Sequence, residues 1–266
     1  MQKIILVTGA SSGLGETIAT HLTTIGHIVY GTSRKPAKPN PACKMLQMDV
    51  QDEQSIRQAI DAIIREQGRI DVLINNAGLG LVGPAEYLST ADLFKIIDTN
   101  VLGVLRTCQQ ALPYMRQQKK GLIINISSIA SENGLPYRAA YSASKAAVDR
   151  ITEAIRLEVA PFGIQACYVQ PGGFNTAIND NRMVTQLPSG AAYTESWERT
   201  HSIIKESVAT GLDPQKAAVF IEKIINSKKV KRCYRIGRPL EKLSVFLKRI
   251  LPDATYDNMV SKHFQV

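Results

Sequence analysis

The sequence lacks the long apolar run that a membrane-spanning helix needs. Such a helix requires roughly 18 or more consecutive apolar residues, and the 266-residue chain has no run of that length. The opening stretch MQKIILVTGA predicts a strand rather than a secretory signal, which would have a longer apolar segment and a small-residue cleavage site. We therefore expect a cytoplasmic protein with reduced thiols.

Cysteine and histidine are scarce and scattered. The chain has four of each, and no pair shows the spacing of a metal site or of a disulfide framework. Cysteines of this kind are most often small buried side chains, and we expect this of Cys43, Cys108, Cys167 and Cys233. We therefore expect no metal.

Acidic residues are few toward the C-terminus. Between Pro214 and Val266 there are twelve Lys or Arg and four Asp or Glu, which leaves eight of the nine net positive charges in this segment. A basic patch can attract an anionic membrane, an acidic protein or nucleic acid. We interpret it as a solvated surface, expect no nucleic-acid binding, and do not favour peripheral membrane contact.

Apolar runs alternate with amphipathic stretches over most of the chain. The runs are continuous, as expected of strands buried on both faces of a parallel sheet. They are KIILVT, IVYGT, KMLQMDV, DVLINNAG, GLIINISS and IQACYVQPG. Helical patterns span Gly13–Ile25, Glu53–Gln67, Ala91–Met115 and Tyr141–Ala160. This alternation predicts an α/β fold: a single domain over residues 1–266 with a doubly wound, Rossmann-type parallel sheet and helices on both faces.

The pattern changes after Pro171. Residues 172–211 have no clear period, and so long an irregular segment is usually a lid or binding loop. A helix from Pro214 to about Asn226 and a short strand near RCYRIG follow. From Leu240 to Leu251, apolar residues form one stripe of a helix, which could lie on an anionic membrane or cover a substrate cleft. We favour the cleft, and assign residues 172–211 and 239–266 to a substrate lid.

A glycine-rich turn, TGASSGLG from Thr8 to Gly15, links the first predicted strand to the first helix. Glycines allow the backbone to approach a pyrophosphate, and the helix N-terminus supplies free N–H groups. The second strand ends in Ser33-Arg34 rather than in the acid that usually binds a free ribose 2′-hydroxyl. Because Arg suits a 2′-phosphate, the pattern favours NADP over NAD.

Tyr141 and Lys145, in the stretch YSASK, fall within a predicted helix. Residues four apart share one helix face, so the pair is either a solvated face or a catalytic acid with a neighbouring cation. Free tyrosine stays protonated up to about pH 10, and a cation beside it would favour proton release. Ser128 ends a predicted strand, where such sheets bind ligands, and its hydroxyl could polarise a substrate oxygen.

Taken together, these motifs resemble the main branch of the short-chain dehydrogenase/reductase family over roughly residues 3 to 180. The resemblance rests on the glycine-rich turn, Asn75-Asn76-Ala77-Gly78, Asn100 in DTNVLG, Ser128 thirteen residues before Tyr141, the Tyr141/Lys145 pair, and Pro171-Gly172 followed by Thr176. The departures are Ser131 in place of a common glycine and Gly173-Phe174 after the Pro-Gly step.

The resemblance implies a role for each matching residue. Tyr141 would be the general acid, Lys145 would assist it and bind the nicotinamide ribose, Ser128 would hold the substrate oxygen, and Asn100 would hold a water that resupplies the proton. The implied NADP(H) contacts are Gly9, Ser11, Ser12, Gly13, Leu14, Gly15, Ser33, Arg34, Asp49, Val50, Asn76, Ala77, Gly78, Tyr141, Lys145, Pro171, Gly172 and Thr176.

The expected reaction is hydride transfer between the nicotinamide and a carbonyl or secondary alcohol. The long C-terminal extension resembles that of the steroid and retinol dehydrogenases, which implies a substrate of steroid or retinoid type. Apolar candidate pocket residues also favour a hydrophobic carbonyl or alcohol over a sugar phosphate. These residues are Leu79, Leu81, Val82, Leu135, Pro136, Tyr137, Phe174, Met183, Leu187, Tyr193 and Trp197, some of which could be core instead. An acyl-carrier-protein ketoreductase or a non-catalytic NADP sensor are the alternatives. The resemblance also implies a homodimer or homotetramer, paired through the two long helices.

Overall fold

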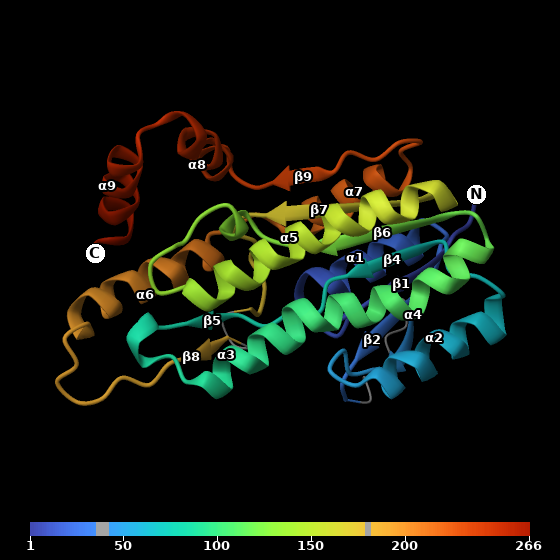
Figure 1. Ribbon diagram of the computed structural model, residues 1–266, viewed down its shortest axis with the longest axis horizontal. Coiled ribbons are helices and arrows are strands. Elements are labelled where there is room, and N and C mark those ends of the chain that lie inside the picture. Colours follow the sequence, from blue (N-terminus) through green and yellow to red (C-terminus); the bar gives the residue numbers. More distant parts are fainter. Residues whose placement is uncertain (36–42, 179–181) are drawn as a thin grey trace.

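A parallel sheet of seven strands, in the order β3-β2-β1-β4-β6-β7-β9, runs through the centre of the protein (Figure 1). The computed structural model describes residues 1–35, 43–178 and 182–266. The strands are β1 (Ile4–Val7), β2 (Ile28–Ser33), β3 (Lys44–Gln47), β4 (Val72–Asn75), β6 (Gly121–Ile126), β7 (Ile164–Pro171) and β9 (Cys233–Ile236). Every residue of β1, β4 and β6 is buried, which explains their continuous apolar sequences.

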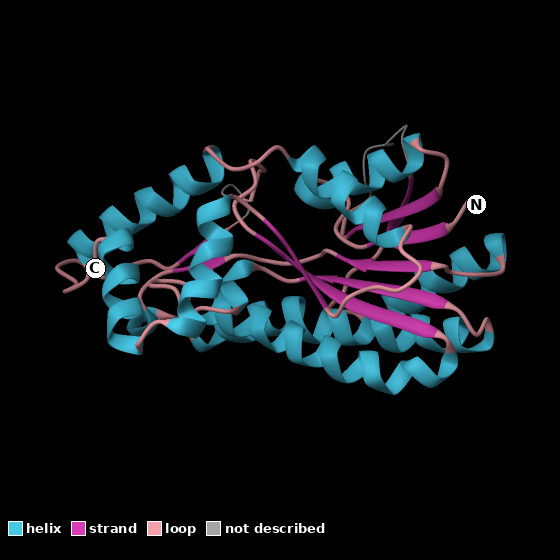
Figure 2. Ribbon diagram, turned by 90° about the horizontal axis from the view of Figure 1, so that it is seen from above, coloured by secondary structure: helices cyan, strands magenta, loops and turns pink. Residues whose placement is uncertain are grey.

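Helices cover both faces of the sheet, as Figure 2 shows. One face packs against α1 (Gly13–Thr24) and α7 (Pro214–Ile225), and the other against α2 (Glu53–Gln67), α4 (Gly103–Gln117) and α5 (Ala139–Val159). Each layer has its own apolar cluster, so the sheet separates two cores. The predicted doubly wound α/β fold is confirmed.

The strand order reverses between β1 and β4. The chain leaves β1 toward β2 on one side and later returns to place β4 on the other, with Ile5 paired to both Val29 and Val72. In sheets of this kind, ligands bind beyond the carboxyl ends of the strands at such a switch point. The glycine-rich turn after β1 and the Asn75–Gly78 turn after β4 therefore flank the expected binding site.

The segment predicted as one helix over Ala91–Met115 has an interruption. Helix α3 (Thr90–Ile97) passes through a π-helical turn, Asp98–Leu102, into α4. Asn100 lies at the centre of this turn and is completely buried. Single π-turns inside α-helices are frequent at functional sites.

The prediction that residues 172–211 are irregular is wrong for their second half. Helix α6 (Thr194–Ala209) occupies it, and β8 (Met183–Val184) pairs with β5 (Leu81–Val82) in a small second sheet. The α6 residues that face the protein, Trp197, Thr200, Ile204 and Val208, have helical spacing. Two facts hid this pattern: one of the four is a threonine, and charged residues lie between them.

The C-terminal segment forms two helices at the end of the molecule that holds the carboxyl ends of the strands (Figure 1). Helix α8 (Pro239–Ile250) matches the predicted amphipathic run, whereas α9 (Asp253–Phe264) was not predicted. Three short 3₁₀ turns, Ala85–Tyr87, Ile129–Ser131 and Ala160–Phe162, complete the regular structure of the described residues. No helix in the described parts of the chain is long and apolar enough to cross a membrane.

Candidate active site

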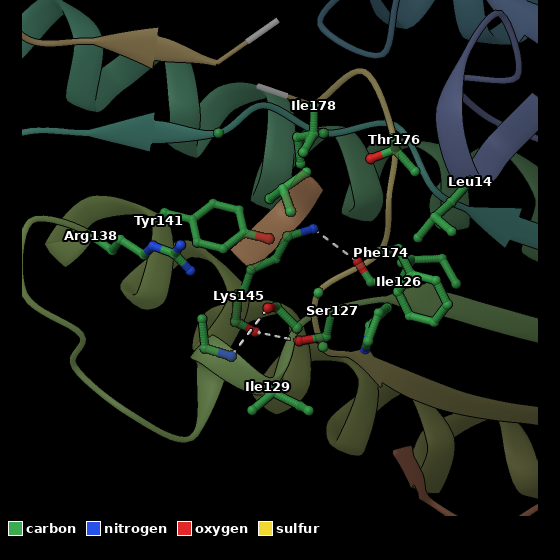
Figure 3. Close-up of a pocket in the computed structure, with 18 of the residues that line it drawn as sticks. Leu14, Ile126, Ser127, Ile129, Arg138, Tyr141, Lys145, Phe174, Thr176 and Ile178 are labelled. Atoms are coloured by element: carbon green, nitrogen blue, oxygen red, sulfur yellow. Dashed lines mark hydrogen bonds between the residues drawn. The ribbon is translucent and has the colours of Figure 1, made fainter. Parts of the chain in front are cut away.

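A cavity of about 870 Å³ lies beyond the carboxyl ends of the central strands. Its wall continues from the glycine-rich turn past Ser128, Tyr141 and Lys145 to α8 and α9. Figure 3 shows Leu14 of the turn, Tyr141 and Lys145 on this wall. One cavity therefore joins the predicted cofactor cradle, the predicted catalytic residues and the C-terminal helices.

The glycine-rich turn fits tightly against the turn after β4. Gly9 has a φ of +66°, and a Cβ there would lie 2.8 Å from the Ala77 Cα, so no other residue fits without displacing the backbone. The Thr8 hydroxyl accepts hydrogen bonds from the backbone N–H groups of Asn76 and Ala77, at 3.0 and 2.9 Å. The Asn76 amide donates back to the carbonyls of Thr8 and Gly9. These bonds fix the two turns relative to each other.

Most of the predicted cradle residues line the cavity, but two do not. Gly9, Ser11, Ser12, Gly13 and Leu14 are on its wall. Gly15 is not: a Cβ there would lie 2.3 Å from the Asn76 amide, so its role is close packing of α1. Asp49 is also absent from the wall, although its neighbours Met48 and Val50 are on it, and its carboxylate accepts a hydrogen bond from the backbone of Gln51.

The end of β2 presents Thr32, Ser33 and Arg34 to the same cavity. Among the described residues of its wall, Glu241 at the far side is the only acid. The Ser33 hydroxyl donates to the backbone carbonyl of Lys35, whereas the buried Thr32 hydroxyl has no partner among the described residues. A 2′-phosphate would therefore meet Arg34 with no nearby carboxylate on the described wall to oppose it.

Tyr141 and Lys145 lie on the cavity side of α5. The Lys145 Nζ is 5.9 Å from the centre of the Tyr141 ring and donates a 2.9 Å hydrogen bond to the Ile126 carbonyl. This bond fixes a buried cation beside the tyrosine (Figure 3). Ser128 lies in the turn after β6, where its oxygen accepts a hydrogen bond from the Ala130 N–H. Its hydroxyl proton can therefore point into the cavity.

The π-turn places Asn100 behind Lys145. The Asn100 amide oxygen accepts from the Leu79 N–H at 2.7 Å, and its nitrogen donates to the Leu79 carbonyl and to the Ser144 hydroxyl, each at 3.0 Å. A Cβ on Gly78 would come within 3.2 Å of the Asn100 oxygen and 3.4 Å of the Lys145 Nζ. Gly78 therefore leaves a narrow space between the two polar groups.

Some of the predicted pocket residues line the cavity and others do not. Leu79, Leu81, Val82, Leu135 and Phe174 line the cavity, as do the predicted Pro171, Gly172 and Thr176. Pro136, Tyr137, Met183, Leu187, Tyr193 and Trp197 do not, and Trp197 belongs to a core cluster with Val82, Ile204 and Phe264. Sequence reasoning missed Arg138, Arg182 and the residues of α9, for which no motif gave a signal.

Helix α8 reaches the cavity with one edge of its apolar stripe. Leu240, Leu243 and Leu247 line the wall, although Leu240 and Leu243 are also 78% and 46% exposed. Phe246 and Ile250 are exposed and do not line it. The Glu241 carboxylate anchors the start of the helix by accepting from the backbone N–H groups of Gly173 and Arg238, at 3.0 and 2.7 Å.

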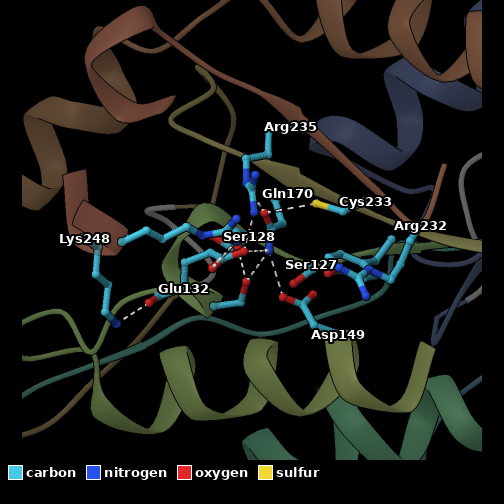
Figure 4. A network of polar contacts seen from close by, with 12 residues as sticks. Ser127, Ser128, Glu132, Asp149, Gln170, Arg232, Cys233, Arg235 and Lys248 are labelled. Atoms are coloured by element: carbon cyan, nitrogen blue, oxygen red, sulfur yellow. Dashed lines mark hydrogen bonds and ion pairs between the residues drawn. The ribbon is translucent and has the colours of Figure 1, made fainter. Parts of the chain in front are cut away.

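A polar network holds the far end of α8 (Figure 4). The Glu132 carboxylate contacts Gln170, Arg235 and Arg249, and its backbone carbonyl accepts from the Lys248 ammonium. Burial alone would raise the pKa of Glu132, but hydrogen bonds from Gln170 and Arg235 and the nearby positive charges hold it below its ordinary value of 4.5. The ionised carboxylate thus connects β7, β9 and α8.

A dinucleotide cradle that opens into the same cavity as a tyrosine, a lysine and a serine defines a nicotinamide-dependent oxidoreductase. The chain belongs to the short-chain dehydrogenase family, whose model matches residues 3–186. The family resemblance predicted from the motifs is confirmed.

Individual relatives cover from 72% to 98% of this chain. A 3-ketodihydrosphingosine reductase from Bacteroides thetaiotaomicron is 45% identical over 94% of each chain. An NADPH-dependent 1-acyldihydroxyacetone phosphate reductase from Schizosaccharomyces pombe is 33% identical over 72% of this chain and 68% of its own. The solved structure of a short-chain dehydrogenase from Streptomyces avermitilis superposes with a TM-score of 0.84, at 31% identity and 98% coverage of both chains.

Proposed function

We propose that this protein is an NADPH-dependent reductase of a ketone that lies near the polar end of a long alkyl chain, with 3-ketodihydrosphingosine as the first candidate. The observation that carries the proposal is the course of the cavity, which continues past Tyr141 between apolar side chains of α8 and α9. The two reductases described above support it, because the names of both substrates describe a ketone on a lipid. This likeness favours a linear chain over the steroid or retinoid expected from the sequence.

The residues present fit a nicotinamide dinucleotide. Gly9 and Gly13 both have positive φ and leave the turn open to a pyrophosphate, and Ser12 begins the helix whose free N–H groups face it. Arg34 supports a preference for the 2′-phosphate of NADP. When bound, the cofactor supplies the hydride.

The side chains around Tyr141 then have distinct tasks. Tyr141 would donate the proton to the carbonyl oxygen, which the Ser128 hydroxyl also holds. The Lys145 ammonium, fixed by the Ile126 carbonyl, would stabilise the tyrosinate that remains. Asn100, held by Leu79, would position a water in the space beside Gly78 and so return a proton toward Tyr141 through Lys145. A general acid placed in this way typically contributes about 10²- to 10⁴-fold in rate.

A substrate panel tests the proposal. We expect NADPH oxidation with 3-ketodihydrosphingosine and much lower kcat/KM with a steroid ketone, with retinal and with a β-ketoacyl group on acyl carrier protein. Preference for the carrier-bound substrate would support the alternative ketoreductase function. Cofactor binding without turnover of any carbonyl compound would support a non-catalytic sensor and contradict the proposal.

A further inference from the structure

Arg138 lies in the cavity wall three residues before Tyr141. It has no role among the expected catalytic residues, and the packing of the fold does not explain an arginine at this position. Its Nε atom is buried without a hydrogen-bond partner. Its guanidinium makes no ion pair or side-chain hydrogen bond within the described parts of the chain. Figure 3 shows Arg138 and Tyr141 next to each other on the same wall.

The position is an unfavourable one for a cation. Arg138 is the N-cap residue of α5, and the positive end of a helix dipole disfavours a positive charge. Burial, and next the charge of Arg182 on the same wall, lower the pKa of Arg138 to about 10. A structural arginine is normally paired with a carboxylate when it is enclosed. Arg138 is half-buried, and its Nε has no hydrogen-bond partner among the described residues, which suggests that a ligand supplies the partner.

We propose that Arg138 donates hydrogen bonds to an oxygen atom on the polar end of the substrate, within a few bonds of the carbonyl that Tyr141 protonates. This rests on the proposed function. Guanidinium nitrogens only donate, and their planar fork suits a hydroxyl oxygen or, still better, the oxygens of a phosphate. Both candidate ketones carry such an oxygen: a hydroxyl in 3-ketodihydrosphingosine and a phosphate in 1-acyldihydroxyacetone phosphate. A protonated amine is repelled here, so the amino group of the first ketone would point away from Arg138.

The test compares two ketones in two proteins. The ketones are 3-ketodihydrosphingosine and its analogue with hydrogen in place of the 1-hydroxyl, and the proteins are the wild type and Arg138→Met. If Arg138 binds the hydroxyl, the wild type prefers the hydroxylated ketone in kcat/KM by about 10- to 100-fold, as expected for a hydrogen bond to a charged group. Arg138→Met should lose this preference, chiefly through KM, and Arg138→Lys should retain part of it.

Two controls keep the result specific. Arg150→Met, which removes an exposed arginine on the same helix, should leave the preference unchanged. NADPH affinity and Tm should show that Arg138→Met is folded and holds the cofactor. Repeating the comparison with 1-acyldihydroxyacetone phosphate identifies the preferred acceptor: a larger loss than with the hydroxylated ketone points to a phosphate, and a smaller loss to a hydroxyl.

The outcomes separate this inference from the proposed function. If Arg138→Met lowers kcat/KM equally for both ketones, Arg138 does not bind the polar end of the substrate. The protein would still be a long-chain ketone reductase. If the wild type reduces no long-chain ketone, the proposed function fails and this inference fails with it.

Discussion

Arg34 illustrates how much of the expected cofactor preference depends on a single residue. It lines the cavity at the end of β2, a position where an acidic residue would bind a free ribose 2′-hydroxyl. We expect the wild type to bind NADPH more tightly than NADH, and Arg34→Asp to reverse the order. The change should be about tenfold or more, because a hydrogen bond to a charged group contributes roughly 1.5–3 kcal/mol. Cofactor titrations on both proteins measure it.

A charge reversal elsewhere provides the control for this experiment. Arg57→Asp alters an exposed arginine of α2 and should leave the ratio of the two affinities unchanged. Equal affinity of the wild type for NADPH and NADH would contradict the role of Arg34.

The positions of residues in strong local motifs could be predicted from the sequence, whereas the positions of residues that depend on tertiary contacts could not. Tyr141, Lys145, Ser128 and most of the glycine-rich turn lie on the cavity, because helix spacing and strand ends determine their positions. The position of Asp49 off the wall was not predictable, since it depends on where its short strand ends. Nor was Arg138: its unpaired state becomes visible only when all its neighbours are placed.

At the scale of elements, the unexpected features are the π-turn before α4 and the helices α6 and α9. A π-turn is hard to recognise in the sequence, because its extra residue leaves the helical period on either side intact and shifts only its phase. The strands and the helices that flank them were predictable, since their burial on the sheet imposes a clear period. Helix α8 was predictable from its apolar stripe, whereas α9 buries only Tyr256 and Phe264 and has a weak pattern.

Glu132 should stabilise the attachment of α8. The folded pKa of its carboxylate is below the ordinary 4.5, so the stabilisation is complete above about pH 4.5 and is lost as the pH falls through the lower folded value. We expect Glu132→Gln to lower Tm at pH 7 and to have little effect at a pH below the folded pKa. Thermal melts across this range test it.

Glu158→Gln is the matched control, because it neutralises an exposed glutamate on α5. A Glu132→Gln variant that melts at the wild-type temperature at pH 7 would show that the network does not contribute to stability.

Helix α8 offers a test of the predicted lid. Leu247 lines the cavity, whereas its neighbour Phe246 is 57% exposed and faces outward. If the helix closes over the substrate, Leu247→Ala should raise KM for the long-chain ketone without changing NADPH affinity, and Phe246→Ala should alter neither. Deleting residues 240–266 should weaken substrate binding and stability while the cradle still binds cofactor.

A membrane role for α8 would give the opposite pattern. Flotation of the intact protein with anionic liposomes, lost in Phe246→Ala but not in Leu247→Ala, would contradict the interpretation of α8 as a lid alone.

At the scale of the whole molecule, the predicted dimer or tetramer needs exposed apolar side chains on its long helices. Val148 and Ile155 of α5 cannot contribute, because both are buried in the core of this chain. The outer surface of the same region instead exposes Phe94 and Leu157, at 71% and 76%. Large apolar side chains this exposed often mark an interface. We expect light scattering to show a dimer or tetramer at micromolar concentration, and Leu157→Glu to dissociate it.

A monomeric wild type under these conditions would refute the oligomer. Glu158→Gln, a neighbouring change on the same exposed turn of α5, should leave the assembly intact and so controls for surface effects.

The rate of NADPH oxidation with 3-ketodihydrosphingosine, in the wild type and in Tyr141→Phe, tests the central claim most directly. Because phenylalanine keeps the ring and removes only the proton donor, we predict turnover by the wild type and a loss of about 10²-fold or more in the variant. NADPH affinity should change little. A phenylalanine variant that kept most of the wild-type rate would show that another group is the acid and would contradict the account.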